Sequence, residues 1–262
     1  MADFSPEEFD PLSTKDLTAI ICRKFEEQRP HGLANLPHFT RAGLYAIYYA
    51  GTTRDLYVPL SGLLIPLYVG SAQQHNSATG ASAPTSSPLW KRVHDHEVSI
   101  DQSDLDISEF QVRLLLMPDV HIDLGENGLR VGYKPVWNSV LTGFGSREQG
   151  STTRQGKQSK WDAVHPGRAR THGSQRDDRT ELIDAAADLI DRQVSLCGTE
   201  GLDWSTYDPD AIKVFTRPSQ SANKPEWVDY AIDTHGVDPA EANAMTKAKL
   251  IELYGSGARP ES

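Results

Sequence analysis

Two short runs rich in aliphatic and aromatic residues, GLYAIYY at residues 43–49 and LLIPLYVG at residues 63–70, decide the fold. Runs of this composition favour β-strands, so we expect strands over 43–49 and 63–69, the second ended by a glycine. Because the runs follow one another along the chain, we expect them to form a hairpin with a long connection. Each strand holds a tyrosine, Tyr45 or Tyr68, close to a glycine that lets a ligand or a second backbone approach.

Helical patterns and a third strand surround the two runs. Residues 13–28 carry apolar residues at helical spacing, and Ser13 can cap their first turn, with Asp16 three residues later. The run FQVRLLLM at 110–117 is the clearest strand of the chain. Further helices are expected at 89–100, at 126–141 with a bend or a new start at Pro135, and at 180–196. This order of elements predicts an α/β fold with a small, mainly antiparallel sheet flanked by helices.

The remaining segments divide into loops, a linker and a C-terminal unit. Residues 71–88 and 142–174 are poor in apolar residues and rich in small or polar ones, so we expect two long loops. Residues 219–225 have the composition of a linker. We therefore expect a first domain at 1–218 and a small unit at 226–255, in which a helix, a turn and a short helix share a tiny apolar core.

The charge of the chain is unevenly distributed. Its formal net charge is −10 and its pI is about 5.3, which alone argues against binding to nucleic acid. Residues 147–179, however, carry twice as many basic as acidic side chains. The basic ones are Arg147, Arg154, Lys157, Lys160, Arg168, Arg170, Arg176 and Arg179. An acidic protein can still present a basic face to a polyanion.

Several classes of protein are disfavoured by composition. No apolar run approaches the ~20 residues needed to cross a bilayer, and the acidic start of the chain lacks the apolar core of a secretion signal. Cys22 and Cys197 are isolated, so they make neither a disulfide framework nor a metal site. We therefore expect a cytoplasmic protein with free thiols and no membrane association.

Four polar residues extend the pattern of the two strand tyrosines. Arg92 and His96 are four residues apart on an expected helix and therefore share one of its faces. Glu126 lies near the start of the expected helix at 126–141, and Asn138 follows it by twelve residues, so these two are expected to share a helical surface.

In this order the residues resemble the GIY-YIG nuclease superfamily. The resemblance runs through Gly43-Leu44-Tyr45, Tyr68-Val69-Gly70, Arg92, His96, Glu126 and Asn138. Within that superfamily the chain is most similar to small restriction endonucleases that cut CCGCGG, because of the Arg-x-x-x-His pair, the Glu-to-Asn spacing and the stretch WDAVHPGR at 161–168. Leucine and valine replace the two isoleucines of the motif, and the connection between the tyrosines is longer than in the minimal domain.

The resemblance implies a metal-dependent type II restriction endonuclease that hydrolyses double-stranded DNA at a short, G·C-rich palindrome. Glu126 would hold Mg²⁺ or Mn²⁺, and Arg92 would clamp the phosphate. The general base is either Tyr45 or His96, since a phenol with a pKa near ~10 needs help from nearby cations. The remaining two residues, Tyr68 and Asn138, would orient phosphate or water.

Cutting both strands of a palindrome needs two active sites related by a two-fold axis, so we expect a homodimer on DNA. Six residues of the basic segment are the expected DNA contacts, because arginine pairs well with guanine. They are Arg147, Arg154, Lys157, Lys160, Arg168 and Arg170. His165 and His172 either touch phosphates or serve the loop, and Trp161 is expected to anchor it.

Two alternative functions remain open from the sequence. The first is a homing or repair nuclease of the same superfamily, although such proteins usually join the nuclease to longer extensions or assemblies. The second is a DNA-binding protein on an inactive nuclease domain, which the intact six-residue set opposes. The unit at 226–255 resembles the DNA-binding helical modules called SAP-like, but its acidic side chains favour a role in packing or docking.

Overall fold

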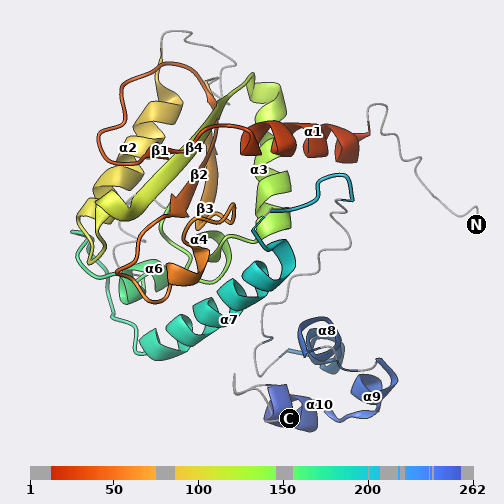
Figure 1. Ribbon diagram of the computed structural model, residues 1–262. Coiled ribbons are helices and arrows are strands. Elements are labelled where there is room, and N and C mark those ends of the chain that lie inside the picture. Colours follow the sequence, from red (N-terminus) through yellow and green to blue (C-terminus); the bar gives the residue numbers. More distant parts are fainter. Residues whose placement is uncertain are drawn as a thin grey trace, which may run out of the picture. The chain divides into compact units, whose positions relative to one another are not determined.

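The computed structural model describes residues 13–74, 86–145, 156–199, 201–206, 218, 222–235, 237 and 239–254. The chain forms two compact units, residues 1–209 and 210–262 (Figure 1). Of the expected linker at 219–225, residues 219–221 lie outside the described residues, and Lys224 and Pro225 belong to a helix. Within the described residues, no helix combines the length and apolarity needed to cross a bilayer.

A four-stranded antiparallel sheet forms the centre of the first unit. The strands are β1 (His31–Gly32), β2 (Gly43–Tyr49), β3 (Tyr68–Ala72) and β4 (Phe110–Leu116). They lie in the order β1-β4-β2-β3, so β3 is an edge strand and β2 is central. All seven residues of β2 are buried, because β2 is paired on both sides and covered on both faces. The predicted antiparallel α/β fold is confirmed.

Helices cover the two faces of this sheet (Figure 1). One face packs against α2 (Pro88–Asp101), which begins at a proline suited to the first helical turn. The opposite face packs against α3 (Asp119–Tyr133), with α1 (Thr14–Glu26) beside it. Ser13 caps α1 by accepting a hydrogen bond from the Asp16 backbone N–H, as expected.

The second strand of the hairpin differs from the expectation. It begins at Tyr68 and not at residue 63, and it continues through Ala72. Pro66 precedes it and has no N–H to donate to a strand partner. The long connection instead holds η1, a turn of 3-10 helix at Val58–Leu60.

The expected helix at 126–141 is wrong in its limits. The helix α3 begins seven residues earlier and ends at Tyr133, where Lys134 adopts a left-handed conformation with φ 48°. Pro135 then precedes a separate short helix, α4 (Val136–Ser139). Because a proline lacks the N–H needed to continue α3, Glu126 and Asn138 lie on different helices and share no helical surface.

The segment beyond α4 contains more helix than expected. The short helix α6 (Lys160–Val164) lies inside the predicted loop at 142–174, and Ser159 caps it. The helix α7 (Arg179–Cys197) confirms the helix predicted at 180–196. Residues 146–155 of the predicted loop, and 75–85 of the earlier one, lie outside the described residues.

The described part of the second unit contains three helices where one helix, a turn and a short helix were expected. They are α8 (Lys224–His235), α9 (Pro239–Ala244) and α10 (Lys247–Tyr254). Trp227, Tyr230, Ala242 and Leu250 are among the buried residues of its small core.

The close contact between α1 and α3 depends on a helical glycine. A Cβ atom built on Gly128 would lie 2.3 Å from Thr18 Cγ2 and 2.7 Å from Cys22 Sγ. Neither neighbour is the far end of a long flexible side chain, so a larger residue would push the two helices apart.

We predict that Gly128→Leu lowers the free energy of unfolding by about 1–3 kcal/mol, because it overpacks the α1–α3 contact. Urea or thermal unfolding measures the change. Asn127→Leu is the matched control, since Asn127 is exposed on the same helix. Equal stability of the two variants would contradict a tight contact at Gly128.

Candidate active site

The site begins where the two motif tyrosines meet on adjacent strands. Tyr45 of β2 pairs with Gly70 of β3 in the antiparallel register. A Cβ atom on Gly70 would lie 2.5 Å from the Tyr45 hydroxyl and 2.7 Å from the ring carbon that bears it. Because glycine has no Cβ, the phenol of Tyr45 can lie across β3 toward Tyr68, whose ring centre is 6.0 Å away.

The helix α2 places His96 against these tyrosines. His96 Nε2 lies 2.5 Å from the Tyr45 hydroxyl oxygen, and both side chains are almost fully buried. The His96 ring centre is also 5.1 Å from that of Tyr68. The structure therefore brings three of the six expected site residues into direct contact.

Arg92 lies one helical turn before His96 and completes this cluster. Its guanidinium interacts electrostatically with the hydroxyls of Tyr45 and Tyr68, and Nη2 donates a hydrogen bond to the carbonyl of Gly145 over 2.6 Å. Burial raises the pKa of Tyr45 well above its usual value, and the nearby Arg92 cation only partly opposes this. Tyr45 is therefore protonated at neutral pH in this environment.

A cavity of about 670 Å³ opens beside this cluster along α2. Its wall includes Arg92 and His96, together with Phe144, Gly145 and Arg170. The cavity therefore gives a substrate access to the guanidinium and to the imidazole.

Glu126 approaches the same edge strand from the opposite face of the sheet. It lies in the middle of α3, and its carboxylate accepts a hydrogen bond of 2.5 Å from the hydroxyl of Ser71 in β3. Its other oxygen is 3.7 Å from the Arg130 guanidinium, and its side chain remains 23% exposed. Because β3 is an edge strand, no further strand separates this carboxylate from solvent on that side.

Asn138 binds the backbone of β3, a role that the sequence did not indicate. Its amide oxygen accepts a hydrogen bond from the backbone N–H of Val69 over 2.7 Å. Its amide nitrogen donates to the carbonyl of Val69 over 2.9 Å. Asn138 thus satisfies both backbone groups of one edge-strand residue and holds the strand between Tyr68 and Gly70 in place.

A comparison with known protein families identifies the family of this chain. The family model of the Eco29kI GIY-YIG domain matches residues 37–190, which is more than half of the chain. The chain belongs to this family. It is therefore a GIY-YIG restriction endonuclease, related to type II enzymes that cut DNA, and the predicted resemblance is confirmed. A comparison with curated proteins gives no match.

The donor atoms of this GIY-YIG domain suit a hard divalent cation. Within the described part of the chain, no group of three or more His, Cys, Asp or Glu side chains is arranged to hold a metal ion. A single carboxylate still fits Mg²⁺, which keeps several of its waters and binds through one or two carboxylates and a phosphate. Glu126, partly exposed and next to the Ser71 hydroxyl, is such a donor.

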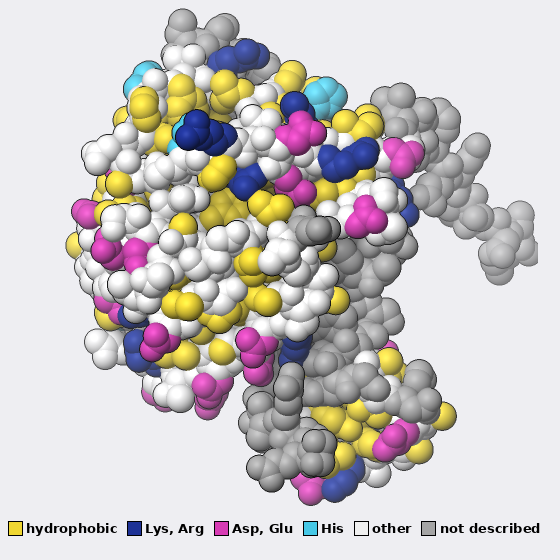
Figure 2. All heavy atoms as spheres, in the orientation of Figure 1, with side chains coloured by type: hydrophobic (Ala, Val, Ile, Leu, Met, Phe, Trp, Pro, Cys, Tyr) yellow, Lys and Arg dark blue, Asp and Glu magenta, His cyan; other side chains and the backbone are white. Residues whose placement is uncertain are grey.

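The six basic residues expected to contact DNA differ in their exposure and in their position in the fold. Arg147 and Arg154 lie outside the described residues. Lys157 is half-exposed and 3.7 Å from Asp177, Lys160 begins α6, and Arg170 lines the cavity. Arg168 is instead buried in an ion pair with Asp162. On the face drawn in Figure 2, basic and acidic side chains of the described residues are interspersed.

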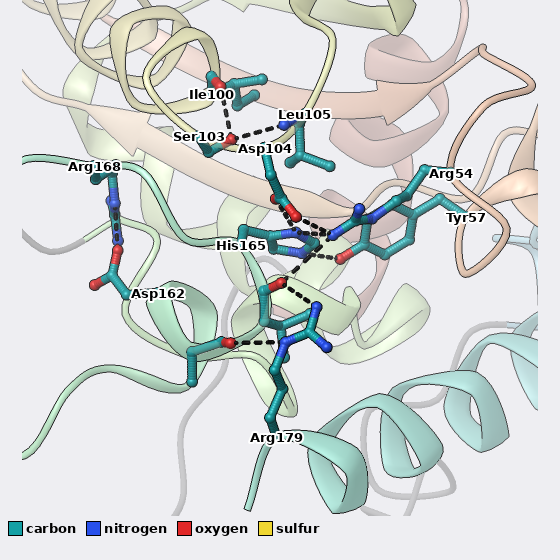
Figure 3. A network of polar contacts seen from close by, with 12 residues as sticks. Arg54, Tyr57, Ile100, Ser103, Asp104, Leu105, Asp162, His165, Arg168 and Arg179 are labelled. Atoms are coloured by element: carbon teal, nitrogen blue, oxygen red, sulfur yellow. Dashed lines mark hydrogen bonds and ion pairs between the residues drawn. The ribbon is translucent and has the colours of Figure 1, made fainter. Parts of the chain in front are cut away.

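A second buried polar network surrounds His165 (Figure 3). His165 is fully buried, and its Nε2 atom lies 2.5 Å from the Tyr57 hydroxyl oxygen. Its Nδ1 atom is 3.4 Å from Asp104, which also pairs with Arg54 over 2.7 Å. The network joins the long connection of the hairpin, the segment before β4 and the segment after α6, so His165 stabilises the fold and does not touch a phosphate in this structure.

Both ring nitrogens of His165 have polar neighbours. Nε2 faces the Tyr57 hydroxyl, whose oxygen also accepts a hydrogen bond from the Trp137 indole N–H over 2.9 Å. Nδ1 faces Asp104 and also Arg54, whose Nη2 atom is 3.2 Å away. Nothing in the spacing of Tyr57 or Asp104 signals this network, whereas the stretch 161–168 did attract attention to His165.

Burial lowers the pKa of His165, although Asp104 partly opposes this. An unfolded histidine has a pKa of about 6.5, so below that pH the unfolded chain binds a proton that the folded chain resists. The stability contributed by neutral His165 is therefore present above about pH 6.5 and is lost as the pH falls below it. Arg54 and Arg179 face the same ring and also disfavour its protonation.

We predict that His165→Gln lowers stability by about 1–3 kcal/mol at pH 7.5, because it leaves buried polar groups without partners. The loss of stability between pH 7.5 and pH 5.5 should be shallower in this variant than in the wild type. Urea unfolding at both pH values measures the slope, and His31→Gln, at an exposed residue, is the control. An unchanged slope would show that His165 does not resist protonation.

Proposed function

We propose that this chain is a divalent-metal-dependent type II restriction endonuclease that cuts both strands of DNA at a short, G·C-rich palindrome, with CCGCGG as the expected sequence. Family membership makes DNA the substrate. The single observation that carries the proposed mechanism is the contact of Arg92 with both motif tyrosines beside an open cavity. Hydrolysis of a phosphodiester needs such a charge clamp beside a group that accepts a proton.

Arg92 is proposed to bind the scissile phosphate. Its planar guanidinium offers several N–H donors, which match the oxygens of a phosphate better than a single ammonium does. In the structure one of these donors is used by the carbonyl of Gly145, and the two tyrosine hydroxyls interact electrostatically with the guanidinium. The guanidinium is thereby held in one orientation at the wall of the cavity before DNA arrives.

Tyr45 and His96 are proposed to act together as the general base. The 2.5 Å contact allows the Tyr45 hydroxyl to pass its proton to His96 Nε2 while its oxygen takes a proton from the attacking water. The water oxygen then bonds to phosphorus, and the bond from phosphorus to the leaving oxygen breaks. Because burial raises the pKa of Tyr45, the phenol does not act alone.

Glu126 is proposed to hold the Mg²⁺ or Mn²⁺ ion. The cation, when bound, supplies positive charge that stabilises the developing negative charge on the phosphate oxygens. Ser71 keeps the carboxylate of Glu126 directed to the edge strand. Tyr68 is proposed to orient phosphate or water through its hydroxyl, and Asn138 to act on the site only by holding β3.

The two alternative functions receive less support. The matched family consists of restriction endonucleases, which disfavours a homing or repair enzyme. An inactive nuclease domain is disfavoured because the six motif residues are intact, and four of them make the contacts that the proposed chemistry needs. All six lie in the first compact unit, at 1–209.

We predict that Glu126→Ala lowers Mg²⁺-dependent cleavage of plasmid DNA by far more than tenfold, because the proposed metal ligand is lost. DNA binding measured in Ca²⁺ should largely survive. Asp123→Ala is the matched control, since Asp123 is exposed one turn earlier on the same helix. Cleavage by Glu126→Ala within about tenfold of the wild-type rate would contradict the assignment.

We further predict that two chains bind one palindromic duplex, because one site of this kind cuts one strand. Sedimentation of Glu126→Ala with a CCGCGG duplex gives the stoichiometry, and mapping the cut ends of plasmid DNA gives the sequence. Lys157, Lys160 and Arg170, with Arg147 and Arg154, are the proposed DNA contacts. One chain per duplex would refute the dimer, and ends that map to an A·T-rich site would refute CCGCGG.

A further inference from the structure

Arg168, in the basic segment 147–179, is buried where it cannot easily reach DNA. The side chain of Arg168 is 2% exposed, and Nε donates to the Asp162 carboxylate over 2.6 Å (Figure 3). Its guanidinium carbon lies 4.3 Å from the centre of the Trp161 ring. Moving this cation to a phosphate would leave Asp162 without its partner in a poorly solvated place, which is costly.

The other two nitrogens of Arg168 bind consecutive backbone carbonyls. Nη1 donates to the carbonyl of Phe144 over 3.0 Å, and Nη2 donates to that of Gly143 over 3.3 Å. We call residues 143–145 the bridge segment. One planar side chain thus fixes the first two residues of the bridge segment, which a lysine with its single ammonium group would not reproduce.

The bridge segment is in direct contact with the proposed active site. The Gly145 carbonyl accepts the 2.6 Å hydrogen bond from Arg92 Nη2. The Phe144 ring stacks on His96, with ring centres 4.5 Å apart and planes 20° from parallel. The fit is close, because a Cβ atom on Gly145 would lie 2.1 Å from the Tyr68 hydroxyl. A shift of the bridge segment would therefore displace the side chains on which cleavage depends.

We propose that Arg168 is a positioning residue for DNA cleavage: it holds the bridge segment, and the bridge segment holds Arg92 and His96 in their working orientation. This assignment rests on the proposed function of Arg92 and His96. It replaces the expectation that Arg168 contacts DNA. The nearby Arg170, which lines the cavity, keeps the role of a DNA contact.

A substitution of Asp162 distinguishes a DNA contact from a positioning role for Arg168. Its carboxylate accepts hydrogen bonds from Arg168 Nε and from the Ser159 hydroxyl, each over 2.6 Å. If Arg168 binds DNA, Asp162→Asn removes a competing negative charge and should strengthen binding. If Arg168 positions the bridge segment, the same substitution should slow cleavage, because it weakens the contact that orients the guanidinium.

The test compares Arg168→Ala, Arg168→Lys and Asp162→Asn in the full chain. We expect each to lower the single-turnover cleavage rate at saturating DNA, by about 100-fold for the alanine variant, because a small displacement of the site has that effect. The salt dependence of DNA binding in Ca²⁺ should stay that of the wild type. Lys157→Ala is the contrasting variant, since Lys157 is exposed and loss of a phosphate contact lowers the salt slope by about 1.

A readout independent of activity is the proton NMR signal of the His96 ring, assigned with His96→Gln. The stacked Phe144 ring shifts this signal, so loosening the bridge segment should move it in all three variants while the chain stays folded. If Arg168→Ala does not fold, Arg168→Lys and Asp162→Asn decide the matter. Should the wild type cut no DNA, the proposed function fails, and the NMR signal still tests the link between Arg168 and His96.

Two results would overturn the inference. The first is wild-type cleavage and an unmoved His96 signal in the folded variants, which would show that Arg168 does not hold the site. The second is a salt slope that falls by about 1 in Arg168→Ala, or tighter DNA binding by Asp162→Asn, since either would mark Arg168 as a phosphate contact.

Discussion

The passage of the Tyr45 side chain across Gly70 is the constraint on which the site depends. Only a residue without Cβ leaves room for the phenol over β3, where it meets His96 at 2.5 Å. That crossing requires the register that pairs Tyr45 with Gly70, and the register is held from both sides of β3. On one side is the full-length pairing with β2, and on the other Asn138 binds the Val69 backbone. A shift of β3 by one residue would turn Tyr68 to the opposite face and would move Gly70 away from Tyr45.

The described residues include two tyrosine–histidine pairs of the same 2.5 Å length, and their surroundings differ. His96 lines a cavity and its partner Tyr45 lies near a guanidinium, which is why this pair is the one proposed to take a proton from the attacking water. His165 is sealed by its neighbours, and its partner Tyr57 accepts a hydrogen bond from an indole. The same two kinds of side chain are thus proposed to act in catalysis as Tyr45 and His96, and they stabilise the fold as Tyr57 and His165.

Formal charge is a poor guide to which arginine acts on DNA. Arg92 and Arg168 are both tied to backbone carbonyls of the bridge segment, and only Arg92 lines the cavity. A buried cation paired with a carboxylate contributes little to the field that attracts a polyanion, whereas it can fix a backbone in place. The acidic net charge of the chain is therefore compatible with DNA cleavage if a few exposed cations, such as Lys157, face the substrate.

The sequence by itself determined the strand of Tyr45 and the helix that aligns Arg92 with His96, because strand composition and helical spacing are local properties. The family followed from the resemblance of the ordered motif residues to known nucleases. It misplaced the start of β3 and the limits of α3, where Pro66 and Pro135 interrupt the pattern. Only the tertiary structure decided that Asn138 binds β3 and that Arg168 and His165 are buried. Those outcomes rest on contacts between residues far apart in the chain, such as Asn138 with Val69 or Tyr57 with His165, and local periodicity carries no information about them.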